Sequence, residues 1–159
     1  MIVNKIIFVA KTSTTALFIL FSLLITNPAS GRAYFEVSVE EAVTTEIGQE
    51  KLLGIPFYMS GQEHPPVEKD FSIYKANKRS AKGIGSIKKC QVAFISAIIS
   101  LQNRAKNMGG DGLIDVISIT GRNNLESSDK FRCLSGAHMV NVELVGRVVK
   151  FSKEKSEKE

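Results

Sequence analysis

Hydrophobic and polar positions alternate with two different periods along this chain. From Ile87 to Met108, apolar residues recur at steps of three and four, which is the spacing of one face of an amphipathic helix. Gly109 and Gly110 follow, and glycine commonly ends a helix because it adopts a left-handed conformation without a steric penalty. The sequence therefore predicts one long helix over 87–108.

Shorter segments have the period of two that is typical of half-buried strands. Within 67–76, this alternation places Phe71 and Ile73 together on one face. Two prolines make 60–66 a loop, since proline cannot donate a hydrogen bond to a sheet. The segments in which we expect strands are 35–39, 53–59, 67–76, 112–119, 130–134 and 138–151.

A minor helix is predicted near the start of this pattern. Ser38 and Glu41 have the spacing of a capping box, which predicts a helix over 40–52, weakened by its threonines and a glycine. Residues 77–86 are polar and contain glycine, so we expect a linker there. The predicted fold is α+β: an antiparallel sheet of five or six strands packed on one long helix, with a minor N-terminal helix.

Residues 1–33 have the organisation of a secretory signal peptide. Lys5 and Lys11 precede an apolar run at 16–25, and a helix-breaking proline and small residues follow. Cleavage after Gly31 and cleavage after Ala33 both satisfy the small-residue rule. The apolar run is shorter than the roughly 20 residues of a membrane-spanning helix, so we expect a cleaved signal and a periplasmic protein without a spanning helix.

Composition and charge narrow the class of protein further. Without Lys5 and Lys11, the formal net charge falls from +5 to +3, which is too small to indicate nucleic-acid binding. Residues 34–151 are enough for a single domain with its own core, and 43% of the whole chain is hydrophobic. Residues 152–159 alternate lysine and glutamate around serines, which predicts a disordered charged tail.

Cys90 and Cys133 are the only cysteines. In an exported protein the simplest interpretation is one disulfide, which would tie the long helix to a strand. A metal site that combines both cysteines with His64 and His138 stays open as an alternative, although no two of these residues have the close spacing of zinc ligands. A redox-active pair is disfavoured, since there is no Cys-x-x-Cys motif.

Catalytic chemistry has little support in the sequence. His64 follows Glu63 in the proline-containing loop, and the two could act as an acid–base pair. No serine-hydrolase, zinc-protease or phosphate-loop motif accompanies them. We therefore expect a protein that is not an enzyme and needs no cofactor, with His64 and His138 as candidate ligand-binding residues only.

Two features are candidates for binding a partner. Val92, Ile95 and Ile99 form a second apolar stripe on the long helix, which is either buried inside the fold or docks another subunit. A basic cluster without an acid either faces solvent or binds an anionic partner, such as lipid headgroups, lipopolysaccharide or an acidic protein surface. Its six members are Lys75, Lys78, Arg79, Lys82, Lys88 and Lys89.

Several motifs carry a resemblance to known proteins. They are Ser60-Gly61-Gln62-Glu63-His64-Pro65, the segment 90–97 with Leu101-Gln102 and Arg104-Ala105, Gly109-Gly110, and Cys133 followed by Gly136-Ala137. On these motifs, residues 58–150 resemble a family of small exported bacterial proteins that is commonly labelled "excinuclease ATPase subunit". The chain has neither a phosphate loop nor zinc-finger cysteines. The resemblance therefore implies a fold and an exported location, but no active site.

A more distant similarity concerns the order of helix, Gly-Gly, strand and long final strand. This order is similar to the disulfide-bonded domain of the outer-membrane stress-sensor lipoprotein of the Rcs pathway, and to small heavy-metal-binding domains; the lipid-bearing cysteine of the former is missing here. Related domains are accessory subunits of envelope machines, including outer-membrane parts of type IV secretion systems. We expect a non-catalytic periplasmic interaction module of this kind, held at the outer membrane by envelope proteins. A periplasmic metal- or small-ligand-binding domain is the alternative.

Overall fold

The computed structural model describes residues 32–81, 86–121 and 123–152. The predicted signal segment up to Gly31, the cation Lys82 and the predicted tail from residue 153 onward lie outside the described residues. No helix within the described ranges is both long and apolar enough to cross a membrane.

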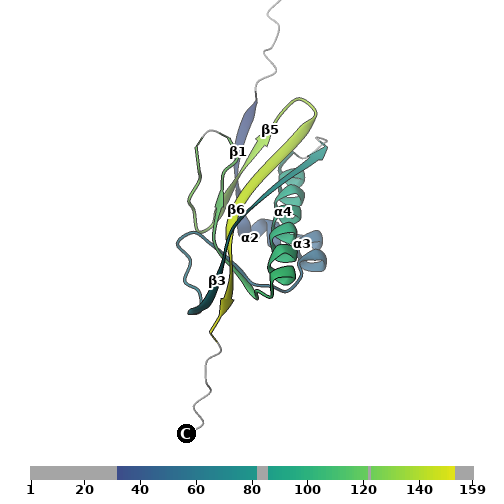
Figure 1. Ribbon diagram of the computed structural model, residues 1–159. Helices are drawn as coiled ribbons and strands as arrows, with labels where there is room; N and C mark the ends of the chain where they lie inside the picture. The colour runs from purple at the N-terminus through teal and green to yellow at the C-terminus, as the bar shows by residue number, and fades with distance from the viewer. Residues whose placement is uncertain (1–31, 82–85, 122, 153–159) are drawn as a thin grey trace, which may run out of the picture.

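A six-stranded sheet packs against one long and two short helices in the described chain, as the α+β pattern predicts (Figure 1). The helices are α2 (Val39–Val43), α3 (Glu46–Lys51) and α4 (Ser86–Met108). The strands are β1 (Ala33–Ser38), β2 (Phe57–Met59), β3 (Val67–Ala81), β4 (Gly112–Ser118), β5 (Lys130–Ser135) and β6 (Met139–Phe151).

The final strand, β6, is the centre of the sheet. One edge of β6 pairs with β3 over its whole length, while the other edge pairs first with β5 and then with β4. The strand β1 adds to β5, and β2 adds to β4. The sheet is antiparallel, as predicted, apart from the short β2–β4 pair, which runs parallel.

Two hydroxyl groups complete the backbone pairing where β6 changes partner. Ser118 Oγ accepts a hydrogen bond from the Arg132 N–H of β5 at 3.1 Å, and Thr120 Oγ1 accepts one from the Glu143 N–H of β6 at 2.7 Å. Both side chains are fully buried. A buried N–H without a partner costs about 1–3 kcal/mol. These hydroxyls therefore stabilise the fork of the sheet, which is the point along β6 where its pairing changes from β5 to β4.

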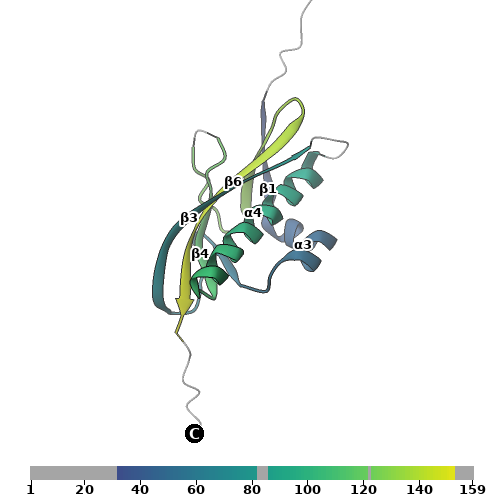
Figure 2. The same cartoon turned by 45° about the vertical axis from the view of Figure 1, so that its right-hand side comes forward.

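The long helix covers one face of the sheet, over β3 and β6 (Figures 1 and 2). It begins and ends within one residue of its predicted bounds, and Gly109 has the left-handed φ of +76° that ends it. The shorter α2 and α3 pack against α4 in turn, so this helix is covered by the sheet on one side and by the short helices on another. The core comprises inward side chains of α4 and β6, among them Phe94, Ile98, Leu101, Val140, Val142 and Leu144.

The predicted minor helix is split into α2 and α3. Ser38 Oγ accepts a hydrogen bond from the Glu41 N–H at 3.2 Å, which is half of the predicted capping box. Thr45 then caps a new helix by accepting from the Gly48 N–H, also at 3.2 Å. The prediction of one helix was wrong because threonine caps a helix end more favourably than it continues one.

The strand predicted at 53–59 is reduced to three residues. Gly54 has a φ of +74°, which an extended strand does not contain. The buried Gln102 side chain of α4 forms the hydrogen bonds that a neighbouring strand would otherwise form: its Oε1 accepts from the Leu53 N–H at 3.1 Å, and its Nε2 donates to the Ile55 carbonyl at 2.6 Å. The segment before β2 is therefore held to the helix and not to the sheet.

The strand β3 begins at Val67 as predicted, but its end and its register differ from the prediction. It continues to Ala81, so residues 77–81 are strand and not linker, because they pair with the first residues of β6. Near its start, the pairing with β6 shifts by a bulge between Asp70 and Ser72, and Ser72 has a φ of +126°. The bulge reverses the alternation: Phe71 packs partly against the core, but Ile73 is 55% exposed.

Candidate functional site

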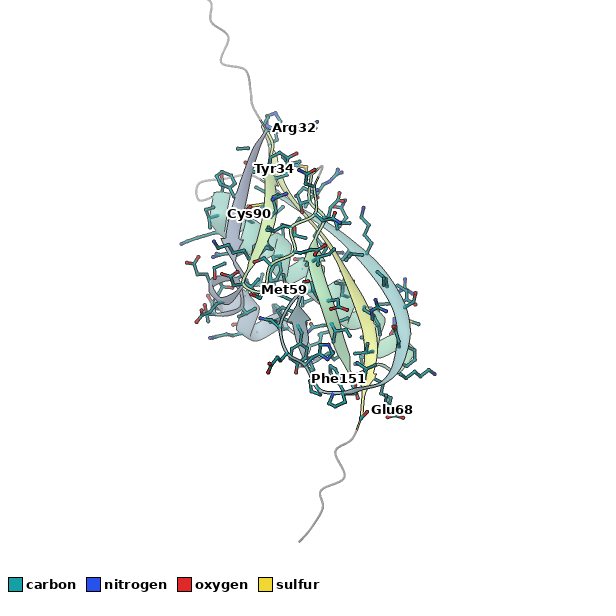
Figure 3. The ribbon with its side chains drawn as sticks, turned by 90° about the vertical axis from the view of Figure 1, so that its left-hand side faces the viewer. Arg32, Tyr34, Met59, Glu68, Cys90 and Phe151 are labelled. Carbon is teal, nitrogen blue, oxygen red and sulfur yellow. A yellow bond between two sulfur atoms is a disulfide. The ribbon has the colours of Figure 1, made fainter. Side chains whose placement is uncertain are left out.

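The face of the sheet opposite α4 carries no helix in the described part of the chain (Figure 3). On β6, every second residue points to this helix-free face, while the residues between them are buried beneath α4. The set combines polar, apolar and charged side chains: Asn141, Glu143, Val145 and Arg147. The face is thus neither a core surface nor a uniformly charged one.

An apolar strip crosses this face over three strands. Val145 of β6 lies directly opposite Ile117 of β4, and Ile73 of β3 is the diagonal neighbour of Val145. Ile73 is the most exposed of the large hydrophobic side chains in the described residues. The strip lines a hollow of about 230 Å³, which is also bordered by Asp115 and Glu126.

Arg147 forms the rim of the strip at one end. Its guanidinium NH1 lies 2.6 Å from Asp70 Oδ2, and its Nε lies 3.6 Å from Asp115 Oδ2. The hydrogen bond from Arg147 lowers the pKa of the Asp70 carboxyl below its ordinary range, and the same bond raises the pKa of Arg147. Both groups are therefore charged at neutral pH and hold each other in place beside Ile73.

Glu143 organises the rim on the other side of the strip. Its carboxylate lies 3.0 Å from Lys75 Nζ and accepts hydrogen bonds from the side-chain amides of Asn77 and Asn141. Three neighbouring side chains are thus ordered around one half-buried carboxylate. The two rims leave the apolar strip as the uncovered part of this face.

A second hollow, of about 720 Å³, lies on the same face where β1 pairs with β5. Arg132 spans it: NH2 lies 3.2 Å from Glu36 Oε1, and NH1 donates to the Asn123 carbonyl at 2.9 Å. Arg32 and Tyr34 also line this hollow and lie at one end of the molecule, with Phe151 at the other (Figure 3). Because Glu36 already pairs with Arg132, the hollow is a mixed-charge surface and not a concentrated cation site.

The predicted disulfide is confirmed. Cys90 and Cys133 are bonded, with their Cα atoms 5.8 Å apart, and both are fully buried. The bond ties the first turn of α4 to β5, as the sequence predicts. Disulfide sulfurs are not available as thiolate ligands, so the metal site that used both cysteines is wrong.

The two histidines lie at opposite ends of β6. His64 packs against Tyr58 and Phe151, with ring centroids 5.9 and 6.3 Å apart, and its Nδ1 lies 2.9 Å from the Pro65 carbonyl. His138 directly precedes the first residue of the strand. A strand of 13 residues separates them by about 40 Å, so they cannot share a ligand.

Among the described side chains, neither histidine belongs to a cluster of possible metal ligands. His64 contacts the Pro65 carbonyl, and no ion pair joins it to Glu63 among the described side chains. Searched over the same residues, His, Cys, Asp and Glu form no cluster of three or more that could hold a metal ion. Residues 61–66, which include His64, are all exposed.

The second apolar stripe of α4 is only partly covered. Ile95 is completely buried in the core, and Val92 and Ile99 are half-buried. The helices α2 and α3 pack against α4, which accounts for an apolar face on more than one side of this helix. The docking interpretation is wrong for Ile95, whereas Val92 and Ile99 each keep part of their surface exposed.

The basic cluster is divided between the two faces of the sheet. In the register with β6, Lys75 and Arg79 lie on the helix-free face, whereas Lys78 lies on the face of α4. Lys88 and Lys89 are in the first turn of α4. The five described cations therefore follow the edge of the molecule and do not form one flat patch.

No family model, curated protein or solved structure matches this chain. The helix-free face is therefore characterised by its own geometry. The sequence did not predict its apolar strip for two reasons. The outward position of Ile73 depends on the bulge at Ser72. Which face of the sheet stays uncovered depends on where α4 packs. The only local signal was the alternation within 138–151, which separates the two sets of β6 residues but does not say which set is covered.

Proposed function

We propose that this protein is a non-catalytic, exported interaction module that binds a partner protein of the cell envelope through its helix-free face. The observation that carries the proposal is the apolar strip of the exposed Ile73 and the half-buried Val145 and Ile117, which lines a hollow and is bordered by ordered charged side chains. An apolar centre within a polar rim is the usual anatomy of a protein interface. In this role the protein is an accessory subunit of an envelope assembly, such as an outer-membrane secretion complex.

The order within the rims supports binding by this face. Asp70 and Glu143 already hold Arg147, Lys75 and Asn77 in place in the free protein. A side chain that is ordered before association loses less conformational entropy on binding, commonly about 0.5–1.5 kcal/mol for each flexible side chain. A partner of complementary charge could therefore contact this rim at little entropic cost.

A periplasmic location is supported by the disulfide, since such bonds persist in oxidising compartments. It predicts that the protein isolated from the periplasm begins at Arg32 or at Tyr34. Fractionation followed by intact-mass measurement tests this. A chain that retains residues 1–31 and stays in the cytoplasm would overturn the exported location.

The binding face is tested by photocrosslinking in intact cells. A photoreactive amino acid at Ile73 or at Ile117 should give an adduct with the same envelope protein, because both positions belong to one strip. The matched control is Gln49, which is exposed on α3 on the other side of the sheet. Adducts from Gln49 alone, or none from the strip, would overturn the proposal.

A further inference from the structure

The strand β3 is the longest edge strand among the described strands. It pairs only with β6, so along its other edge the N–H and C=O groups of every second residue point away from the sheet. Bulges interrupt the pairing before Ser72, but from Ile73 to Ala81 each residue pairs with β6 without a shift. These nine residues form a regular open edge about 30 Å long.

This edge has an excess of positive charge. Lys75, Lys78 and Arg79 lie on it, and no Asp or Glu occurs between Phe71 and Gly110. Lys75 is paired with Glu143, but no ion pair involves Lys78 or Arg79 within the described ranges. Arg79 is exposed and Lys78 half-exposed, so both are free to meet an anionic group.

We propose that the edge of β3 from Ile73 to Ala81 binds an extended acidic segment of a partner protein, which joins the sheet as a further strand. Backbone hydrogen bonds supply affinity in this mode, and side chains on alternate faces supply specificity. An antiparallel segment meets Arg79 first, then Lys78, then Lys75. The matching pattern, read from its N-terminus, is acid, acid, any, any, acid.

The charges argue against two other occupants. If two copies of this chain paired antiparallel through residues 73–81, Lys75 of one copy would lie opposite Arg79 of the other, and directly opposed like charges are destabilising. A membrane surface is flat, whereas Lys75 and Arg79 lie on one face of the sheet and Lys78 on the other. A strand laid along the edge reaches both faces at once.

This inference rests on the proposed function only in that the partner is a protein; the edge shares Ile73 and Lys75 with the helix-free face but not Val145 or Ile117. The probe is a nine-residue peptide of threonine and valine with glutamate at positions 3, 4 and 7, mixed with protein whose disulfide is intact. We expect saturable binding by fluorescence anisotropy, and slower hydrogen exchange of the backbone amides in 73–81. A peptide with glutamate at positions 3, 6 and 7 fits only a parallel strand and should bind more weakly.

Arg79→Glu should weaken binding of the first peptide by about tenfold, since it places like charges opposite each other. Lys51→Glu makes the same change in net charge on α3 and should leave binding unchanged. A peptide N-methylated at alternate amides keeps its charge but cannot pair as a strand, so equal binding of this peptide would overturn the inference.

Two further outcomes would also overturn it: no binding of the first peptide, or binding only to vesicles that contain an anionic phospholipid. No binding would mean that the cations of β3 only protect an exposed edge from aggregation. None of these results bears on crosslinking at Ile117, which lies on β4 and not on this edge, so failure of the edge is distinguishable from failure of the proposed function.

Discussion

Phe94 and Phe131 stack face to face, with ring centroids 4.1 Å apart and an interplanar angle of 15°. Phe94 lies one helical turn after Cys90 on α4, and Phe131 lies two residues before Cys133 on β5. The stack and the disulfide therefore join the same face of the helix to the same face of the strand. One contact is covalent and depends on redox conditions, and the other is apolar and does not.

Removal of the disulfide should weaken the fold without abolishing it. A double variant, Cys90→Ala with Cys133→Ala, should lose about 2–5 kcal/mol of unfolding free energy, because the bond joins residues 43 positions apart and restricts the unfolded chain. The Phe94–Phe131 stack remains, so we expect cooperative unfolding in urea. A reductant should lower the stability of the natural protein and leave that of the double variant unchanged. If the two proteins had the same unfolding free energy without reductant, the prediction would be contradicted.

Gln102 should be essential for holding the segment before β2. Gln102→Leu has a similar volume but leaves the Leu53 N–H and the Ile55 carbonyl without their partner, so we expect a loss of about 1–3 kcal/mol in unfolding free energy. Hydrogen exchange should become faster at Leu53. The control is Asn103→Leu at the neighbouring exposed position, which should change stability by less than about 0.5 kcal/mol. Similar losses in both variants would show that the hydrogen bonds of Gln102 do not matter.

The sequence predicted elements whose signals are local and repeated. The helix over 87–108 was found almost to the residue, because its apolar period extends over six turns and a double glycine ends it. The disulfide was predicted from the expected export of the protein and from the cysteine count. The fork of the sheet could not be predicted, since it depends on hydroxyl groups at Ser118 and Thr120 that bind backbone atoms of distant strands.

The candidate site was predicted less well than the fold, and the reason is the register of β3. A single bulge at Ser72 turns Ile73 outward and Tyr74 inward, which reverses the alternation read from the sequence. Arg104 of α4 then lies over the Tyr74 ring, 5.0 Å from its centroid, and holds that register. Nothing within 67–76 alone signals a bulge, so the exposed apolar strip needed the three-dimensional structure.

Stability should decrease in acid through Asp70. Its pKa is lowered in the folded protein, chiefly by the hydrogen bond from Arg147, from an ordinary value of 3.8. A carboxyl with a depressed folded pKa stabilises the fold above its unfolded pKa, and this contribution is lost as the pH falls through the folded pKa. The difference in unfolding free energy between the natural protein and Asp70→Asn should therefore be positive at pH 6 and close to zero near pH 2.

Urea unfolding at the two pH values measures this difference. Asn103→Ala, at an exposed position of α4, removes no titrating group; it is the control and should leave the pH dependence unchanged. A difference for Asp70→Asn that stays constant between pH 6 and pH 2 would contradict the ion pair.

Gly112 lies beneath the ring of Phe151, and an added methyl group should displace that ring. A Cβ at position 112 would lie 2.1 Å from Phe151 Cε2, so the ring must move away in Gly112→Ala. Phe151 also packs against Tyr58 and His64, and its displacement should shift the ring-proton resonances of His64. We expect a loss of about 1–3 kcal/mol in unfolding free energy from this overpacking.

The chain contains only two histidines, so His138, at the far end of β6, is an internal reference for the His64 resonances. In Gly136→Ala the nearest heavy atom would be the Met139 carbonyl oxygen, 3.4 Å away, so His64 should be unaffected there. Phe151→Leu combined with Gly112→Ala should recover part of the lost stability, since the smaller side chain makes room for the methyl group. Unchanged His64 resonances in Gly112→Ala would mean that Phe151 does not hold His64 against the end of the sheet.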